Sequence, residues 1–240
     1  MKYALVDGIK TEATPKAQGK CLCCGVEVIA KCGEKRVWHW AHKNNEECNY
    51  SKKDTKTPWH ENWQKQFPPD WCEVRCPEDK PIHIADIKTP DELVVEFQHS
   101  HISAEDRLAR EKFHKNMIWV VDGCRNKNDY KRFVKNFHKL SRLNKKDQEI
   151  PFSLYKAFQT DEILPSTWSE ITVPIYFDFS NIKEKDKKMD FHESIWGFYL
   201  REKQITVIEM NFDDFVRVIK KDAIQYFPNA ISSILNDKKF

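Results

Sequence analysis

The chain has 240 residues, and its 40 Lys and Arg against 37 Asp and Glu leave a net charge of only +3, which gives no overall signal for a polyanionic partner. Its 40% hydrophobic and 32% charged residues are typical of a folded, highly charged protein. No segment approaches the roughly 20 apolar residues of a membrane span, and the start "MKYALVDGIK" lacks the apolar stretch of a secretory signal. We therefore expect a cytoplasmic protein without a membrane partner.

The first region, 1–50, begins with the strand-like stretch "YALVDG" and then becomes rich in Cys and His. It contains a C-x₂-C pair, an H-x₂-H pair and Cys48, and we expect its two other cysteines, Cys23 and Cys32, to be bystanders. Thiolates and imidazoles on two short turns are the ligands of a tetrahedral zinc, and the hairpin-like stretch 26–40 brings the two turns together. Four protein ligands leave no open position, so we expect a structural zinc. The predicted ligands are Cys21, Cys24, His42 and Cys48, with His39 as the alternative for one place.

The second region, 51–146, alternates helical and strand patterns, as in an α/β core. Trp59, Trp63 and Phe67 recur at four-residue steps and predict one face of a helix. Ser103, with Asp106 three residues later, predicts the start of another helix. The expected elements are a helix from Pro58 to before Pro68, strands over 71–76, 82–87 and 93–100, a helix after Ser103, a strand over 117–123 parallel to its predecessor, and a basic helix within 127–146.

The third region, 147–240, contains a strand candidate, "TVPIYFDF", then the predicted hairpin "SIWGFYL" and "QITVIEM", and a closing helix from about Asp213. It shows no catalytic pattern. Its role is to complete the sheet, to bind substrate or to mediate assembly, either as a homo-oligomer or with a protein partner.

Residues 92–100, "ELVVEFQHS", place a carboxylate in the middle of an apolar, β-branched run. The period of two in a strand puts Leu93 and Phe97 on one face and Glu96 and Gln98 on the other. A carboxylate in such a place needs a partner, an ion or water. The stretch therefore predicts either a half-exposed strand or a functional site.

A hairpin centred near Asp91 places Asp86 directly opposite Glu96, because each lies five residues from the midpoint. Two carboxylates on facing positions, with Cβ atoms about 5 Å apart, repel unless a cation lies between them. A hard divalent ion, Mg²⁺ or Mn²⁺, meets that need and supports phosphodiester hydrolysis. The structural alternative is that Asp86 caps a turn and Glu96 pairs with a nearby Lys or Arg.

Two features offer contacts to nucleic acid. The segment 127–146 is strongly basic, and its Lys and Arg form either a solvated helix face or a face that contacts phosphates. Trp38, Trp40 and Trp59 lie near the candidate site in sequence, where exposed rings would stack on unpaired bases and buried rings would belong to the core.

The segments "WHENWQKQF", "HIADI", "VVEFQHSHIS" and "IWVVDG" follow one another in an order that resembles the CoiA-like competence nuclease family, a branch of the PD-(D/E)xK nucleases. The resemblance covers roughly 20–123, and "WHWAH" is similar to the His-aromatic-Ala-His signature of that family. The positions that match the family's motif are His60, Asp86, Glu96, Gln98, Arg110 and Trp119.

The resemblance implies an α/β (α+β) fold with a PD-(D/E)xK-like mixed central sheet flanked by helices. A small zinc-ribbon-like module precedes this sheet and a β-rich C-terminal extension follows it. The resemblance also implies DNA as the substrate, Asp86 and Glu96 as ligands of a catalytic Mg²⁺ or Mn²⁺, and Arg110 as a phosphate contact. The setting would be DNA uptake and recombination, or defence against foreign DNA.

Some positions depart from the family's pattern. Gln98 stands where the broader superfamily has Lys, and its amide would orient the water or contact a phosphate oxygen. Ile84 and Lys56 stand where the family often has Arg and Glu, so Glu61, beside His60, is our candidate for the acid of the helix. These departures also favour an alternative, a catalytically inactive, zinc-containing nucleic-acid-binding protein. RNA is an alternative substrate on the residues alone.

Overall fold

The computed structural model describes residues 1–35, 37–44, 48, 57–76, 83–114, 116–143, 152–157, 161–183, 190–201 and 204–221. Lys56 and the end of the basic segment, 144–146, lie outside these residues.

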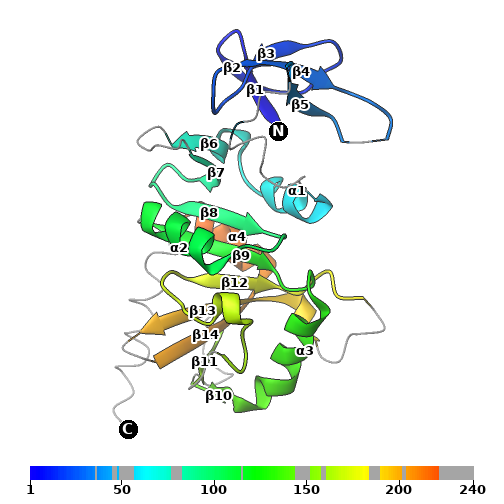
Figure 1. The fold of residues 1–240 in the computed structure, drawn as a ribbon. Coiled ribbons are helices and arrows are strands. Elements are labelled where there is room, and N and C mark those ends of the chain that lie inside the picture. The colour runs from blue at the N-terminus through cyan, green and yellow to red at the C-terminus, as the bar shows by residue number, and fades with distance from the viewer. Residues whose placement is uncertain are drawn as a thin grey trace.

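The N-terminal region forms a small antiparallel sheet of five strands in the order β2-β1-β3-β4-β5 (Figure 1). The predicted hairpin across 26–40 is confirmed, because β4 and β5 pair from Val28↔His42 to Lys31↔His39. Buried Val28 and Trp40 form its core together with the buried Cys21. Its strands are β1 (Tyr3–Val6), β2 (Ile9–Glu12), β3 (Gln18–Lys20), β4 (Glu27–Lys31) and β5 (His39–His42).

The rest of the described chain is organised around one sheet of nine strands in the order β10-β11-β14-β13-β12-β9-β8-β7-β6 (Figure 1). The neighbours β8 and β9 are parallel, as predicted, and so are β9 and β12, whereas the other neighbours are antiparallel. Its strands are β6 (Cys72–Cys76), β7 (His83–Lys88), β8 (Val94–Gln98), β9 (Met117–Asp122), β10 (Ser141–Arg142), β11 (Phe152–Ala157), β12 (Ile175–Asp178), β13 (Ser194–Arg201) and β14 (Gln204–Asn211).

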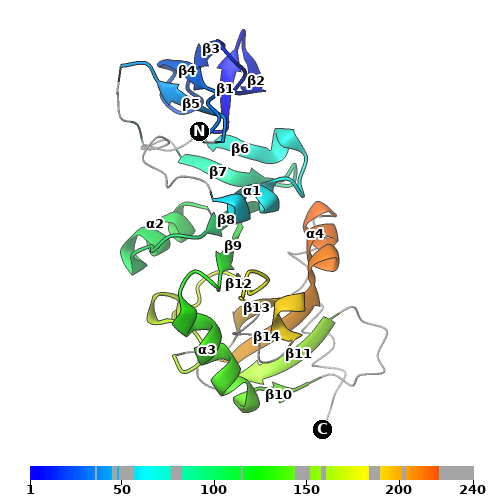
Figure 2. The same ribbon diagram turned by 90° about the vertical axis from the view of Figure 1, so that its right-hand side faces the viewer.

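The four α-helices of the described residues cover the two faces of this sheet (Figure 2). One hydrophobic core holds Trp63 of α1 and Phe215 of α4, and the core on the opposite face holds Phe133 of α3. The sheet therefore separates α1 and α4 from α2 and α3. The helices are α1 (Pro58–Gln64), α2 (Ala104–Phe113), α3 (Lys127–Asn136) and α4 (Phe212–Lys220), with short 3₁₀ turns at η1 (Pro69–Trp71), η2 (Phe137–Lys139), η3 (Ser166–Trp168) and η5 (Asp190–Glu193).

The C-terminal strands continue the same sheet as the strands that precede them. β12 lies directly beside β9, with Ile175 paired to Trp119, and the predicted hairpin of β13 and β14 follows on its other side. One of the three roles considered for this region, completion of the sheet, is therefore confirmed. The part of the chain that the structure describes has a mixed α+β fold with two sheets. None of the helices described is long and apolar enough to cross a membrane.

Candidate functional site

The short helix α1 holds His60 against the nine-stranded sheet. Thr57 caps the helix, since its hydroxyl accepts a hydrogen bond from the His60 backbone N–H at 3.3 Å, and Pro58 occupies the first turn. Trp59 and Trp63 are buried against the sheet, as the four-residue spacing predicts. Their packing fixes the rotation of the helix, so that the imidazole of His60 is directed toward β7.

The strands β7 and β8 pair in the predicted register and then separate. Ile87 pairs with Val95 and Lys88 with Val94, and the same register places Asp86 opposite Glu96. Beyond this pairing the two carboxylates replace the ladder. The Asp86 N–H donates to Glu96 Oε1 at 3.4 Å, and the Phe97 N–H donates to Asp86 Oδ2 at 3.0 Å. We call this place, between Asp86 and Glu96, the β7–β8 gap.

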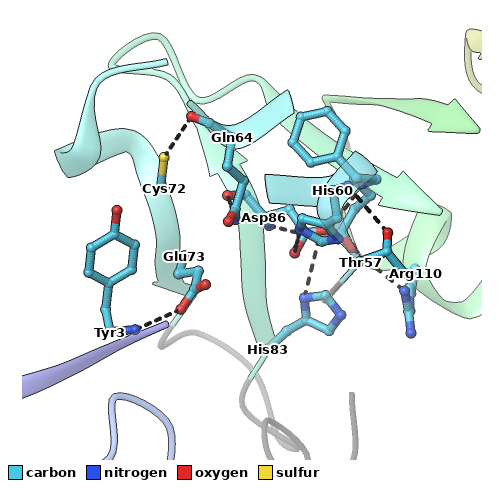
Figure 3. A network of polar contacts seen from close by, with 11 residues as sticks. Tyr3, Thr57, His60, Gln64, Cys72, Glu73, His83, Asp86 and Arg110 are labelled. Atoms are coloured by element: carbon cyan, nitrogen blue, oxygen red, sulfur yellow. Dashed lines mark hydrogen bonds and ion pairs between the residues drawn. The ribbon is translucent and has the colours of Figure 1, made fainter. Parts of the chain in front are cut away.

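Side chains from both faces of the sheet reach the gap (Figure 3). From α1, His60 Nε2 lies 3.4 Å from Asp86 Oδ1. From α2, Arg110 Nη1 lies 3.6 Å from Glu96 Oε2, so this arginine faces the gap rather than pairing only with Asp106 along its own helix. Asp86 and Glu96 are buried, with exposed fractions of 4% and 1%. The structure thus brings together four of the residues that the sequence singled out.

Two other predicted residues lie near the gap without a described contact to its carboxylates. The side-chain amide of Gln98 donates to the carbonyl and the hydroxyl of Ser100, at 2.9 and 3.1 Å. Glu61 is half-buried on α1, next to His60, and no described contact joins its side chain to Asp86 or Glu96. The sequence predicted which elements carry these side chains, but not their direction.

A third carboxyl group, which sequence reasoning missed, belongs to Glu73 on β6. The register of β6 and β7 pairs Cys72 with Ile87 and Val74 with Ala85, which places Glu73 opposite Asp86. Glu73 is 1% exposed, and burial raises its pKa to about 8. The reasoning that paired Asp86 with Glu96 could have identified Glu73 as well, because a hairpin midpoint between positions 79 and 80 pairs Glu73 with Asp86.

Gln64 is the second residue that the sequence did not indicate. It follows His60 by one helical turn, and its amide donates to the Asp86 carbonyl at 3.3 Å. This bond ties α1 to the strand that carries Asp86, and therefore holds His60 and Asp86 in a fixed relation.

The Cys/His cluster of the N-terminal sheet has the dimensions of a tetrahedral metal site. Zinc with thiolates at about 2.3 Å separates two sulfurs by about 3.8 Å. The Sγ atoms of Cys21 and Cys48 are 3.9 Å apart, and His42 Nε2 lies 3.2 Å from Cys24 Sγ and 3.7 Å from Cys48 Sγ. The described cysteines are free thiols. Cys21, Cys24, His42 and Cys48 therefore form a group that can hold a zinc ion.

Side chains alternate between the two faces of β5, and this alternation determines which of its two histidines faces the cysteines. His39 and His42 are three residues apart and so lie on opposite faces. His39 Nδ1 contacts the Val37 carbonyl at 2.9 Å, whereas His42 is buried against the cysteines.

The turn that carries Cys21 and Cys24 depends on a glycine. Gly25 has a φ of +74°, a conformation that glycine adopts at little cost, so the chain reverses directly after Cys24.

A separate cavity of about 700 Å³ lies at the carboxyl ends of the parallel strands, lined in part by Trp59, His99, Asp122 and Asp178. His99 Nδ1 lies 2.7 Å from Asp122 Oδ2, and Asp178 accepts hydrogen bonds from the indole N–H groups of Trp59 and Trp63. The two buried acids of this cavity, Asp122 and Asp178, thus have hydrogen-bond partners within the protein.

Of the three tryptophans considered for base stacking, only Trp38 has an exposed ring. It is 49% exposed next to Val37, which is 62% exposed, whereas Trp40 and Trp59 are buried at 1% and 6%. The two exposed residues lie just before β5, on the module that carries the Cys/His cluster.

Comparison with known proteins finds a similarity in the N-terminal part of the chain. Residues 10–51 match the family model for the N-terminal domain of competence protein CoiA. The match contains all four residues of the Cys/His cluster and ends before α1. No curated protein and no solved structure matches the chain.

Proposed function

We propose that the protein is a metal-dependent nuclease that hydrolyses phosphodiester bonds of DNA, in DNA uptake or recombination or in defence against foreign DNA. The competence-protein match over residues 10–51 favours the first setting. The observation that carries the proposal is the buried Nε2 of His60. It has no hydrogen-bond partner among the described residues and lies 3.4 Å from Asp86 Oδ1.

The residues of the β7–β8 gap fit a divalent cation. A buried imidazole nitrogen without a hydrogen-bond partner costs free energy, and a shared ion would remove that cost. Oxygen ligands suit Mg²⁺ or Mn²⁺, and a nitrogen ligand favours Mn²⁺ of the two. Asp86, Glu96 and His60 would hold the ion, which would supply an activated water and positive charge for phosphodiester hydrolysis.

The remaining polar groups would bind and orient the substrate. The side chain of Arg110 is 29% exposed, so its guanidinium can contact a phosphate while it stays beside Glu96. Gln98 lies at the end of β8, and a turn of its amide away from Ser100 would direct it to the water or to a phosphate oxygen. Glu61 would act from α1, beside His60. Trp38 offers an exposed ring for an unpaired base.

The second candidate is an inactive nucleic-acid-binding protein. Two observations favour it: the amide of Gln98 stands in place of a lysine and bonds Ser100, and Arg110 already provides a positive charge beside Glu96. In this case the carboxylates of the gap would have a structural role, with the Cys/His module and the basic helix α3 providing the binding surface.

A cleavage assay separates the two candidates. The purified full chain is incubated with single-stranded, double-stranded and branched DNA, and with RNA, in Mn²⁺ or in EDTA. We expect cutting of DNA in Mn²⁺ only, and a loss of at least about 100-fold in Asp86→Asn and Glu96→Gln, because even an outer-shell partner of a metal contributes roughly 10–100-fold.

The matched control is Asp91→Asn, which makes the same chemical change at an exposed position in the turn of the same hairpin. It should cut like the wild type. Binding of DNA without cutting by the wild type, unchanged in both gap variants, would instead establish the inactive binding protein.

A further inference from the structure

Two histidines that the proposed nuclease site does not use lie near Glu96. His83 begins β7 and His114 follows the last turn of α2, and the two imidazoles meet although they are far apart in the sequence. His114 Nε2 lies 3.2 Å from His83 Nδ1, and His83 Nδ1 lies 4.0 Å from Glu96 Oε1. One ligand atom from each of the three residues lies within 4.8 Å of the others.

These distances are close to those of a coordination shell. Zinc with imidazole nitrogens at about 2.0–2.1 Å separates two such nitrogens by about 3.3 Å in a tetrahedron. The His83–His114 distance of 3.2 Å agrees with this value, whereas Glu96 Oε1, at 4.0 Å from His83 Nδ1, must approach by about 0.6 Å. A small rotation of the glutamate side chain provides that movement.

The surroundings of the three residues also suit a bound ion. The side chains of Glu96 and His114 are buried, and the ring of Phe113 lies 5.3 Å from the ring of His83 and 4.4 Å from that of His114, so one wall is apolar. Arg110 lies 3.6 Å from Oε2 of Glu96, whereas Oε1 accepts the Asp86 backbone N–H at 3.4 Å and lies 4.0 Å from His83 Nδ1.

We propose that His83, His114 and Glu96 form a second metal site, for a borderline divalent transition ion of the zinc class. Two imidazoles and one carboxylate are ligands that favour such an ion over Mg²⁺. Three protein ligands leave positions for water, unlike the closed Cys/His cluster. The site shares Glu96 with the proposed nuclease site but not His60 or Asp86, and its existence does not depend on nuclease activity.

Cobalt(II) is a direct probe of this site, because its visible bands report on its ligands. The full chain, carrying zinc in its Cys/His cluster, is titrated with cobalt chloride. We expect at least one further Co²⁺ per chain, with ligand-field bands typical of nitrogen and oxygen ligands and without a thiolate charge-transfer band. His83→Gln and His114→Gln should each weaken this binding by more than about 100-fold, since they remove ligands rather than outer-shell partners.

Two variants serve as controls. His138→Gln removes an exposed imidazole in η2, directly after α3, and should bind cobalt like the wild type. Asp86→Asn removes a ligand of the proposed nuclease site but none of the second metal site, and should also retain cobalt bands. Retention of these bands in a protein that does not cut DNA would refute the nuclease and leave this metal site intact.

The proposal is overturned if the wild type binds no cobalt beyond its Cys/His cluster, or if both histidine variants bind it like the wild type. Zinc content and near-ultraviolet circular dichroism establish that each variant is folded. If the variants do not fold, pulsed electron paramagnetic resonance of Cu²⁺ bound to the unaltered chain decides: couplings to two imidazoles support the site, and their absence overturns it.

Discussion

At the scale of single residues, three carboxyl groups lie at facing positions on neighbouring strands. The registers of β6–β7 and β7–β8 place Glu73 opposite Asp86 and Asp86 opposite Glu96. Each group is bonded to backbone: Glu73 accepts from the Tyr3 N–H at 3.4 Å, and the other two accept N–H groups across the gap. The carboxylates of Asp86 and Glu96 therefore take the place of backbone carbonyls in part of the hydrogen-bond ladder. The backbone N–H groups that they accept hold all three carboxyl groups in position.

Glu73 should make the stability of the protein depend on pH. Burial is the main cause that raises its pKa from 4.5 to about 8, and nearby Asp86 adds to this effect. Between these values the folded protein holds a proton that the unfolded chain has released. The free energy of unfolding should therefore fall as the pH rises from about 4.5 to 8.

Glu73→Gln removes this dependence. Relative to the wild type, the variant should gain on the order of 3–5 kcal/mol between pH 5 and pH 8, since each pKa unit corresponds to about 1.4 kcal/mol. Urea unfolding at a series of pH values measures the difference. Glu34→Gln, at an exposed position, should follow the wild-type curve. A wild type whose stability rises over this interval relative to Glu73→Gln would show that Glu73 is ionised when folded.

The sequence could predict the pairing of Asp86 with Glu96, because pairing in a hairpin follows from its midpoint. It could not predict that Arg110 turns toward Glu96, since the choice between that carboxylate and Asp106 depends on the packing of α2. The sequence could not predict the contact between His83 and His114 either. These residues lie at the start of a strand and the end of a helix, and local periodicity does not show that the two ends are close in space.

At the scale of elements, polar contacts from β1 and β2 join the five-stranded sheet to the larger sheet. Lys10 Nζ donates to the Pro69 carbonyl at 2.9 Å, and Tyr3 contacts Glu73 from β1. A sheet of this size has a small core, so a metal at the Cys/His cluster should contribute much of its folding free energy.

Replacing two of the four cluster ligands tests this dependence. The wild type should contain about one zinc per chain, and the double variant Cys21→Ser, Cys24→Ser should lose it. Amide hydrogen exchange should then accelerate in β1 to β5 and stay slow in the central strands β8, β9 and β12, because the larger sheet has its own cores.

The matched control changes the two thiols of the module that lie outside the cluster, as Cys23→Ser, Cys32→Ser. It should keep its zinc. A metal-free wild type with slow exchange throughout β1 to β5 would show that this sheet folds without an ion.

At the scale of the whole molecule, one sheet connects the candidate site to the C-terminal strands. The sequence predicted the parallel pair of β8 and β9, because a helix between two strands favours that arrangement. It did not predict that β12 pairs with β9, since the partner lies 56 residues earlier and local periodicity contains no information on long-range pairing. The β7–β8 gap thus lies near the β6 edge of the sheet, and the C-terminal strands form the opposite half of the same sheet.

The central claim is that the β7–β8 gap binds a divalent ion through Asp86. Electron paramagnetic resonance measures free Mn²⁺ directly as the full chain is added, and His114→Gln serves as the background, so that the second metal site does not contribute. We predict that the His114→Gln protein binds about one equivalent of Mn²⁺. The double variant His114→Gln, Asp86→Asn should bind none. Equal uptake with and without Asp86→Asn, in folded proteins, would contradict the account.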